Sequence, residues 1–374
     1  MTRISFRDFS LVIALIAIVA FFALMSPAFL SPRNLSNLSV EFAITAVLAL
    51  GAFLVLLPGQ TDLSTGSGVG LAGGIAAVLV FTHNWSAPVA LLLSTVVTVA
   101  LWVGMGWFIV KQRIPAFIMT LAGMLIFRGL HWYVIGSKTI PVEVAGQPNL
   151  YSALTTWYLP STGAWIVAGA TVAMLGWSAL ADRRRRVAQQ LAVDNRDVAF
   201  AKWLIPVQLI ILTVVILSQY NGVPLPVLVL GVTAVVVHLL TRHTPFGRHL
   251  YAIGGNREAA RISGINVDRT VIVAFALLGL VVAITGFLQT AYAGGSTTTV
   301  GTLMELDAIA ACVIGGVSLV GGTGSVGGVL FGALIMAALL NGMTLLSVSP
   351  EMKYIARGTV LALAVWMDQA LNRK

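Results

Sequence analysis

Long apolar runs, which follow one another almost without interruption, limit most strongly how this chain of 374 residues can fold. Hydrophobic residues make up 58% of the sequence and charged residues only 9%, against about 25% charged residues in an average soluble domain. These charges are too few to cover a water-facing surface. One membrane-spanning helix needs about 20 apolar residues, so the chain has room for ten or more such helices and short loops. We expect an all-α polytopic membrane protein.

The apolar runs predict twelve membrane-spanning helices. They cover residues 10–30, 41–57, 67–82, 87–110, 115–135, 163–181, 201–220, 224–240, 270–290, 304–320, 327–346 and 353–369. Arg3 and Arg7 precede the first run, as in a signal peptide, but no small-residue cleavage site follows it. We therefore expect the first span to be retained.

The basic residues are unevenly distributed over the two sides of this arrangement. With the N-terminus inside, seventeen of the 22 Lys and Arg lie in inner segments: Arg3, Arg7, Lys111, Arg113, Arg183, Arg184, Arg185, Arg186, Arg196, Lys202, Arg242, Arg248, Arg257, Arg261, Arg269, Arg373 and Lys374. The other five are Arg33, Arg128, Lys138, Lys353 and Arg357. Cytoplasmic loops are enriched in Lys and Arg, so both termini are expected in the cytoplasm. The formal net charge of +9 is explained by this topology and does not indicate a nucleic-acid partner.

Several polar motifs interrupt the apolar runs in a fixed order. They are Asp62-Leu63-Ser64-Thr65-Gly66-Ser67, Arg113-Ile114-Pro115-Ala116-Phe117, Gly255-Asn256-Arg257-Glu258-Ala259-Ala260-Arg261-Ile262-Ser263-Gly264, Glu305-Leu306-Asp307-Ala308 and the glycine-rich run from Gly315 to Ser325. Together they resemble the permease subunit of ribose/xylose/arabinose-type ABC sugar importers. Residues 163–220 add two spans joined by Asp182-Arg183-Arg184-Arg185-Arg186, and in this the chain is similar to the xylose-type branch.

The resemblance implies one transmembrane domain over residues 1–374, with first-half helices in 1–162, an inserted helix pair in 163–220 and second-half helices in 221–374. It also implies a homodimer in the bacterial inner membrane that moves a monosaccharide, xylose or a related pentose. A periplasmic sugar-binding protein would deliver the sugar, and cytoplasmic ABC ATPase subunits would supply energy. The chain has no Gly-x-x-x-x-Gly-Lys-Ser/Thr motif, so ATP and magnesium are expected in the ATPase. We expect no catalytic residue, metal or cofactor in this chain.

Two polar, glycine-rich segments, residues 59–70 and 293–302, are candidates for the sugar pathway. Unwound backbone at membrane depth persists only where protein or a water-filled cavity satisfies it, and inverted repeats place such segments in matching positions. The candidate pathway residues are Asp62, Ser64, Thr65, Ser67, Thr298, Glu305, Asp307 and Asn341. An equally supported alternative is that Asp62 or Ser64 caps the next helix. Glu305 and Asp307 are expected in an outer vestibule or at a helix cap, with Arg128 as a counter-ion, and Asn341 has the alternative of joining helices.

The charged loop 241–269 predicts a contact with the ATPase. We expect Pro245 to end the preceding helix, residues 256–261 to form a short helix, and Gly264 to stop it. The candidate coupling residues are Gly255, Asn256, Arg257, Glu258, Ala259, Ala260, Arg261 and Gly264. The alternative is a solvated connector, which would tolerate charge changes.

Two other functional classes fit the sequence less well. An ion-coupled secondary sugar transporter needs an ion or proton site within the membrane, and no clear pair of carboxylates provides one. An integral membrane enzyme is less favoured, because no histidine–carboxylate metal motif or nucleophile motif lies at a span end.

The run Arg183–Arg186 predicts an anchor at the inner face, with binding of anionic membrane lipid as the alternative.

Overall fold

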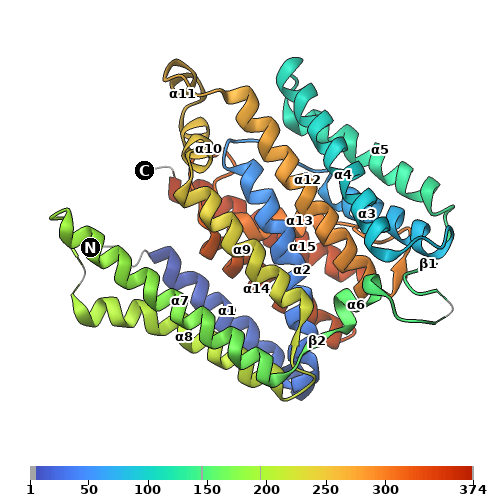
Figure 1. Cartoon of the computed structure of the whole chain (residues 1–374), viewed down its shortest axis with the longest axis horizontal. Helices are drawn as coiled ribbons and strands as arrows, with labels where there is room; N and C mark the ends of the chain where they lie inside the picture. Colours follow the sequence, from blue (N-terminus) through green and yellow to red (C-terminus); the bar gives the residue numbers. More distant parts are fainter. Residues whose placement is uncertain (1–5, 145, 194, 373–374) are drawn as a thin grey trace.

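A computed structural model describes residues 6–144, 146–193 and 195–372, which form a bundle of helices (Figure 1). The longer helices are α1 (Phe6–Met25), α2 (Pro32–Leu56), α3 (Thr65–Phe81), α4 (Ala87–Lys111), α5 (Ala116–Val134), α7 (Ser161–Ala188), α8 (Arg196–Ser218), α9 (Leu225–His243), α12 (Val267–Tyr292), α14 (Val326–Leu345) and α15 (Pro350–Asn372). The shorter ones are η1 (Pro27–Leu30), α6 (Leu150–Thr156), α10 (Pro245–Gly255), α11 (Arg257–Ile262) and α13 (Met304–Ile314). Two antiparallel pairs of short strands join distant loops: β1 (Ile140–Pro141) with β4 (Gly295–Ser296), and β2 (Tyr158–Leu159) with β3 (Val223–Pro224). The all-α prediction is confirmed.

A hydroxyl side chain followed by proline fixes the start of two helices. The Ser31 side chain accepts a hydrogen bond from the backbone N–H of Asn34, and Pro32 is the first residue of α2. Thr244 caps α10 in the same way, with Pro245 as its first residue. The hydroxyl satisfies a free N–H group of the first turn, and proline fits there because its missing N–H would have no partner.

Two predicted boundaries differ from the structure in ways that matter for the site. α2 begins at Pro32 and not at residue 41, so Glu41 lies well inside the helix. α13 ends at Ile314, so the spanning helix predicted for residues 304–320 is wrong over its last third. Residues 315–325 form a non-helical connector with positive φ at four glycines: Gly316, Gly321, Gly322 and Gly324. The α13 helix is about 17 Å long, roughly half the hydrocarbon thickness of a bilayer.

The core of the bundle is built around α2, which lies near the centre in Figure 1 and contacts α9, α12, α13 and α14. Its side chains from Ala43 to Leu56 are almost all buried. The peripheral helices α4, α5, α7 and α9 instead expose large apolar side chains, among them Leu92, Leu125, Ile166, Trp177 and Val232. Exposed apolar surface on this scale is expected where a protein contacts lipid or another copy of itself.

By length and composition, eight helices in the described residues can cross a membrane: α2, α4, α5, α7, residues 198–218 of α8, α9, α12 and α14. Two shorter apolar segments, Leu11–Met25 and Thr65–Phe81, add to them. The polytopic architecture follows from these helices. The number of twelve spans, and the placement of both termini on one side of the membrane, stay predictions.

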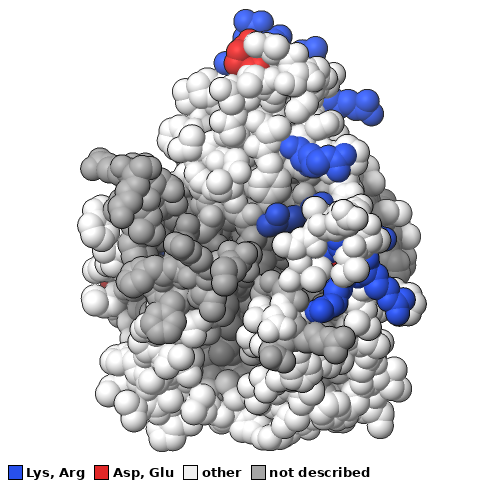
Figure 2. Space-filling view, turned by 90° about the vertical axis from the view of Figure 1, so that its left-hand side faces the viewer, with Lys and Arg blue, Asp and Glu red and all other residues white. Residues whose placement is uncertain are grey.

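Basic side chains gather on one side of the molecule. Figure 1 shows α11, the turn between α7 and α8, and the end of α15 on one side of the bundle, which we call the α11 side, and β1 and α6 on the other, the β1 side. In Figure 2, viewed from the left of Figure 1, Lys and Arg form a band and acidic side chains are few. This distribution favours a cytoplasmic α11 side. Arg3, Arg373 and Lys374, which contributed to the predicted orientation, lie outside the described residues.

Cysteine labelling tests this orientation. In a Cys312→Ser background, we expect Gln147→Cys, in an exposed loop of the β1 side, to react with a membrane-impermeant maleimide in intact cells. Arg184→Cys, near the exposed end of α7, should react only after permeabilisation. Labelling of residue 184 in intact cells would contradict the orientation.

Candidate functional site

The two glycine-rich segments, residues 59–70 and 293–302, meet inside the bundle. Residues 59–64 are non-helical, and residues 65–70 form the buried first turns of α3. A Cβ on Gly66 would collide with the Gly301 carbonyl oxygen, and one on Gly70 would lie 2.6 Å from the Val300 carbonyl oxygen. Gly301 itself has φ +84°, a conformation that favours glycine. Glycine therefore allows these two backbones to touch.

Asp62 holds the non-helical part of the first segment. Its Oδ1 accepts hydrogen bonds from the backbone N–H and the hydroxyl of Ser64, both at 2.6 Å, and its Oδ2 accepts one from Trp102 Nε1 of α4 at 2.8 Å. Leu63 N–H donates to Thr120 Oγ1 of α5 at 3.2 Å. The carboxylate is 4% exposed. Asp62 and Ser64 therefore form a hydrogen-bonded turn before α3, but the Ser64 side chain, at the N-cap position, makes no capping hydrogen bond. The predicted cap is not observed, and the place of both residues in the pathway stays a prediction.

Ser67 and Glu305 are buried polar side chains near the contact between the two segments. The Glu305 carboxylate lies against Gly66, where an added Cβ would collide with Oε2. Neither Ser67 Oγ nor Glu305 Oε2 has a hydrogen-bond partner among the described residues. Thr65, also buried, begins the same turn of α3. Buried polar atoms in native proteins almost always have a partner, so these two atoms are suited to a polar ligand or to water.

An arginine of α15 lies at the start of α13. Arg357 Nε of α15 lies 3.0 Å from Asp307 Oδ1. No ion pair between Arg128 of α5 and either carboxylate is observed among the described residues, so its counter-ion role stays a prediction. Arg357 was missed as the partner of Asp307. Among the described residues, no group of three or more His, Cys, Asp or Glu could hold a metal ion.

Two side chains of α5 hold the second segment. His131 Nε2 lies 3.0 Å from Ser296 Oγ, and both residues are buried. Trp132 Nε1 donates to the Thr298 carbonyl oxygen at 3.2 Å. Thr298 itself is half-buried. The same α5 helix therefore contacts both segments, through Thr120 and through His131.

Asn341 lies in a separate polar network toward the β1 side. Its Nδ2 donates to Glu41 Oε2 at 3.1 Å, and its Oδ1 accepts from Asn34 Nδ2 at 2.9 Å. Tyr292 OH also donates to Glu41, at 3.0 Å. Within the described residues, no hydrogen bond or ion pair joins this network to Ser67 or Glu305. Asn341 thus links α14 to α2, and the sequence analysis missed Glu41 because it placed the helix start too late.

The charged loop forms two short helices in place of the single one that was expected. Asn256 caps α11, with its Oδ1 accepting from Ala259 N–H at 2.9 Å, and Gly264 follows the helix with φ +84°. Ala260 is 5% exposed and seats α11 on the bundle, whereas Arg257, Glu258, Ala259 and Arg261 face solvent. Ile262 beside them is 79% exposed. Pro245 does follow the end of α9, but it also begins α10, which was not predicted.

Comparison with known proteins identifies the family. The family described as a branched-chain amino acid transport system/permease component matches residues 34–365. The xylose transport system permease protein XylH of Escherichia coli (strain K12) is 40% identical over 373 residues, 99% of this chain and 94% of the relative.

Other relatives also align over nearly the whole of this chain. The protein of the same description from Haemophilus influenzae is 39% identical, over 99% of this chain and 98% of the relative. The ribose import permease protein RbsC of Escherichia coli (strain K12) is 32% identical, over 95% and 92%. No solved structure matches the chain significantly. Because the family match covers most of the sequence and the relatives align almost end to end, the chain belongs to this family of transport-system permease components.

Proposed function

We propose that this chain is the transmembrane subunit of an ATP-binding cassette importer that moves a monosaccharide, with xylose favoured, across the bacterial inner membrane. The observation that carries the proposal is the 40% identity to a xylose permease over 99% of the chain. Identity to the ribose permease is lower, at 32%, which favours xylose over ribose. The description of the matching family instead names branched-chain amino acids, so leucine is the competing substrate to test.

The contact between the two glycine-rich segments supports a pathway at this place. Sugars present hydroxyl groups, which must exchange water for protein donors and acceptors during passage. Ser67 Oγ and Glu305 Oε2 are buried atoms free of partners in the described structure. We therefore place Ser67 and Glu305 nearest the sugar, with Thr65, Thr298 and Asp307 around them. Asp62 and Ser64 shape the turn before α3. Asn341 takes part in the pathway through its hydrogen-bond network with Asn34 and Glu41.

The solvent-facing side of α11 suits a docked ATPase. The charges of Arg257, Glu258 and Arg261 surround the exposed Ile262, and an apolar anchor with a polar rim is the usual form of an interface centre. Near the top of Figure 2, at the height of α11, acidic and basic side chains lie together. A separate subunit would bind ATP and magnesium there. On the β1 side, a periplasmic binding protein would deliver the sugar to a homodimer of this chain, whose remaining apolar surface would contact membrane lipid.

Uptake measurements test the substrate. In cells that lack their own xylose importers, co-expression of this chain with its ATPase and binding protein should give ATP-dependent uptake of labelled xylose. Excess unlabelled xylose should compete strongly, ribose weakly and leucine not at all. Uptake of leucine in place of xylose, or xylose uptake without the ATPase, would contradict the proposal; the second result would favour an ion-coupled transporter.

Two alanine variants separate the pathway from the turn that supports it. Ser67→Ala removes a hydroxyl without a protein partner, so we expect slower uptake and an unchanged melting temperature in detergent. Asp62→Ala leaves Trp102 Nε1 without its acceptor, at a cost of about 1–3 kcal/mol, so we expect a lower melting temperature and less folded protein. Normal uptake by Ser67→Ala would remove this residue from the pathway.

Charge reversal tests the coupling surface. We expect Glu258→Lys to reduce the ATPase recovered with the purified permease, because replacing one partner of a buried interfacial charge pair costs about 2–5 kcal/mol. Glu351→Lys, at the exposed start of α15, is the matched control and should leave ATPase recovery unchanged. Equal recovery from both variants, with normal uptake, would show that Glu258 makes no such contact.

A further inference from the structure

Three backbone segments meet below α11 with no side chain between them: residues 57–59, 254–255 and 320–322, which we call the glycine junction. A Cβ on Gly254 would collide with the Leu57 carbonyl oxygen and the Gly322 nitrogen. Gly322 N–H donates to the same Leu57 oxygen at 2.9 Å. Gly321 has φ +100°, and a Cβ there would lie 2.7 Å from Gly59 N and 2.9 Å from Gly254 Cα. The packing therefore requires glycine at positions 254 and 321.

The junction adjoins the first glycine-rich segment of the candidate site and is joined to the second one through α13. Residues 57–59 lead from α2 into the turn of Asp62 and on to α3. Residues 320–322 belong to the connector 315–325, which follows α13 and therefore the helix of Glu305 and Asp307. Gly254 belongs to the last turn of α10, and α11 starts three residues later. Gly254 of α10 thus contacts Leu57, in the chain that leads to α3, and Gly321 and Gly322, in the connector that follows α13.

A second contact ties α10 to the connector one turn earlier. Tyr251 OH donates to the Gly324 carbonyl oxygen at 2.9 Å, and the Arg242 guanidinium lies 5.8 Å from the centre of the Tyr251 ring. Residues 251 and 254 lie on one face of a helix, since three residues make nearly one turn. The connector is therefore held by α10 at two successive points.

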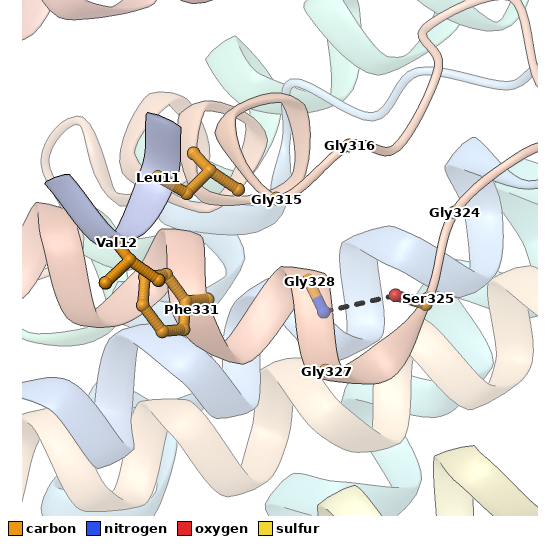
Figure 3. A pocket seen from close by; sticks show the side chains of 9 residues that line it. All are labelled: Leu11, Val12, Gly315, Gly316, Gly324, Ser325, Gly327, Gly328 and Phe331. Atoms are coloured by element: carbon orange, nitrogen blue, oxygen red, sulfur yellow. Dashed lines mark hydrogen bonds between the residues drawn. The ribbon is translucent and has the colours of Figure 1, made fainter. Parts of the chain in front are cut away.

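The connector also borders a cavity. A cavity of about 470 Å³ lies between α1 and the connector, lined by Leu11, Val12, Phe331 and the backbone of several glycines. Figure 3 shows Gly315, Gly316 and Gly324 along its edge, with Ser325 Oγ accepting the Gly328 N–H at the start of α14. Gly315, at the start of the connector, packs against Gly328 of α14, where an added Cβ would collide with the Gly328 carbonyl oxygen. The connector is therefore held by α14 at its start and borders the cavity at Gly316 and Gly324.

We propose that the glycine junction transmits displacement of α10 and α11 to both glycine-rich segments at once, with Gly254 as the positioning residue. This inference rests on the proposed docking of an ATPase on α11. Close-packed contacts transmit displacement because they have no slack to absorb it. An added methyl group at residue 254 separates α10 from Leu57 and from the connector, and so uncouples ATP hydrolysis from sugar movement.

The decisive comparison is Gly254→Ala with Gly231→Ala, at an exposed glycine of α9 whose added Cβ would meet no atom within 4 Å. Both variants are purified as complexes with the ATPase and reconstituted in liposomes. Gly254→Ala should keep ATPase recovery and basal ATP hydrolysis. Stimulation by xylose-loaded binding protein, and xylose uptake, should fall by roughly two- to thirtyfold, the range of coupling changes that single substitutions produce. Gly231→Ala should behave as wild type.

A labelling readout separates transmission from mere structural damage. In a Cys312→Ser background, Thr299→Cys reports on the second segment, where residue 299 is exposed. Addition of ATP and vanadate should change its rate of reaction with maleimide in the otherwise unaltered chain, and should leave that rate constant in the Gly254→Ala variant. A nucleotide-dependent change of the usual size in Gly254→Ala, or normal uptake by it, overturns the inference.

Two further outcomes would also decide between the inference and its alternatives. If Gly254→Ala does not reach the membrane, Tyr251→Phe decides by the same readouts, since it removes only the hydroxyl bonded to Gly324; unaltered stimulation and labelling there overturn the inference. If the unsubstituted chain recovers no ATPase, the proposed function fails, and the inference fails with it. Normal coupling in every junction variant, with ATPase bound, contradicts the inference alone.

Discussion

The buried carboxylate of Asp62 satisfies the backbone at the point where the chain leaves α2 and has not yet begun α3. A chain that breaks its helix at membrane depth loses the hydrogen bonds that a continuous helix supplies, and lipid offers no replacement. Asp62 replaces one of them by accepting from Ser64 N–H, and it also accepts from two side chains, the Ser64 hydroxyl and Trp102 Nε1. Trp102 is itself fully buried and packs against Phe127 of α5, with 5.0 Å between ring centroids and a tilt of 34° between the rings. The break in the helix is therefore held by α4 and α5, and the first turns of α3 can face the second segment.

Glycine allows direct contact between backbones at two places in the bundle. Gly66, Gly70 and Gly301 let the two segments touch, and Gly254, Gly321 and Gly322 let α10 touch the chain before the first segment and the connector after α13. Direct contact between backbones leaves no flexible side chain to absorb a displacement. It also makes both places intolerant of even a methyl group, unlike Gly255 or Gly327, where a Cβ would meet nothing within 4 Å. The arrangement is thus rigid where segments meet and open beside the connector, at the cavity lined by Gly315 and Phe331.

Hydrophobic runs and polar interruptions predicted most of the fold, because each membrane helix is a local property of about 20 residues. Local signals were also present at the two helix starts that were missed, Ser31-Pro32 and Thr244-Pro245. What no local pattern could show are the partners of buried charges, since Asp307 and Arg357 lie 50 positions apart in the sequence and pair only through packing of α13 on α15. The same holds for Asp62, for which the sequence supported a helix cap and a place in the pathway equally and gave no sign of the contact with Trp102.

The contacts of α15 explain how the acidic group of Asp307 is tolerated inside the bundle. Lys353 and Arg357 are four residues apart and so lie on one face of the helix. Lys353 Nζ donates to Thr344 Oγ1 of α14 at 3.1 Å, and Arg357 Nε lies 3.0 Å from Asp307 Oδ1 of α13. An unpaired charge at membrane depth costs several kcal/mol, and the pairing with Arg357 offsets part of this cost for Asp307. Because one helix face makes both contacts, α14, which carries Asn341, and the start of α13 are tied to the same rigid element. Displacement of α13 must therefore either carry α15 with it or separate the Asp307–Arg357 pair.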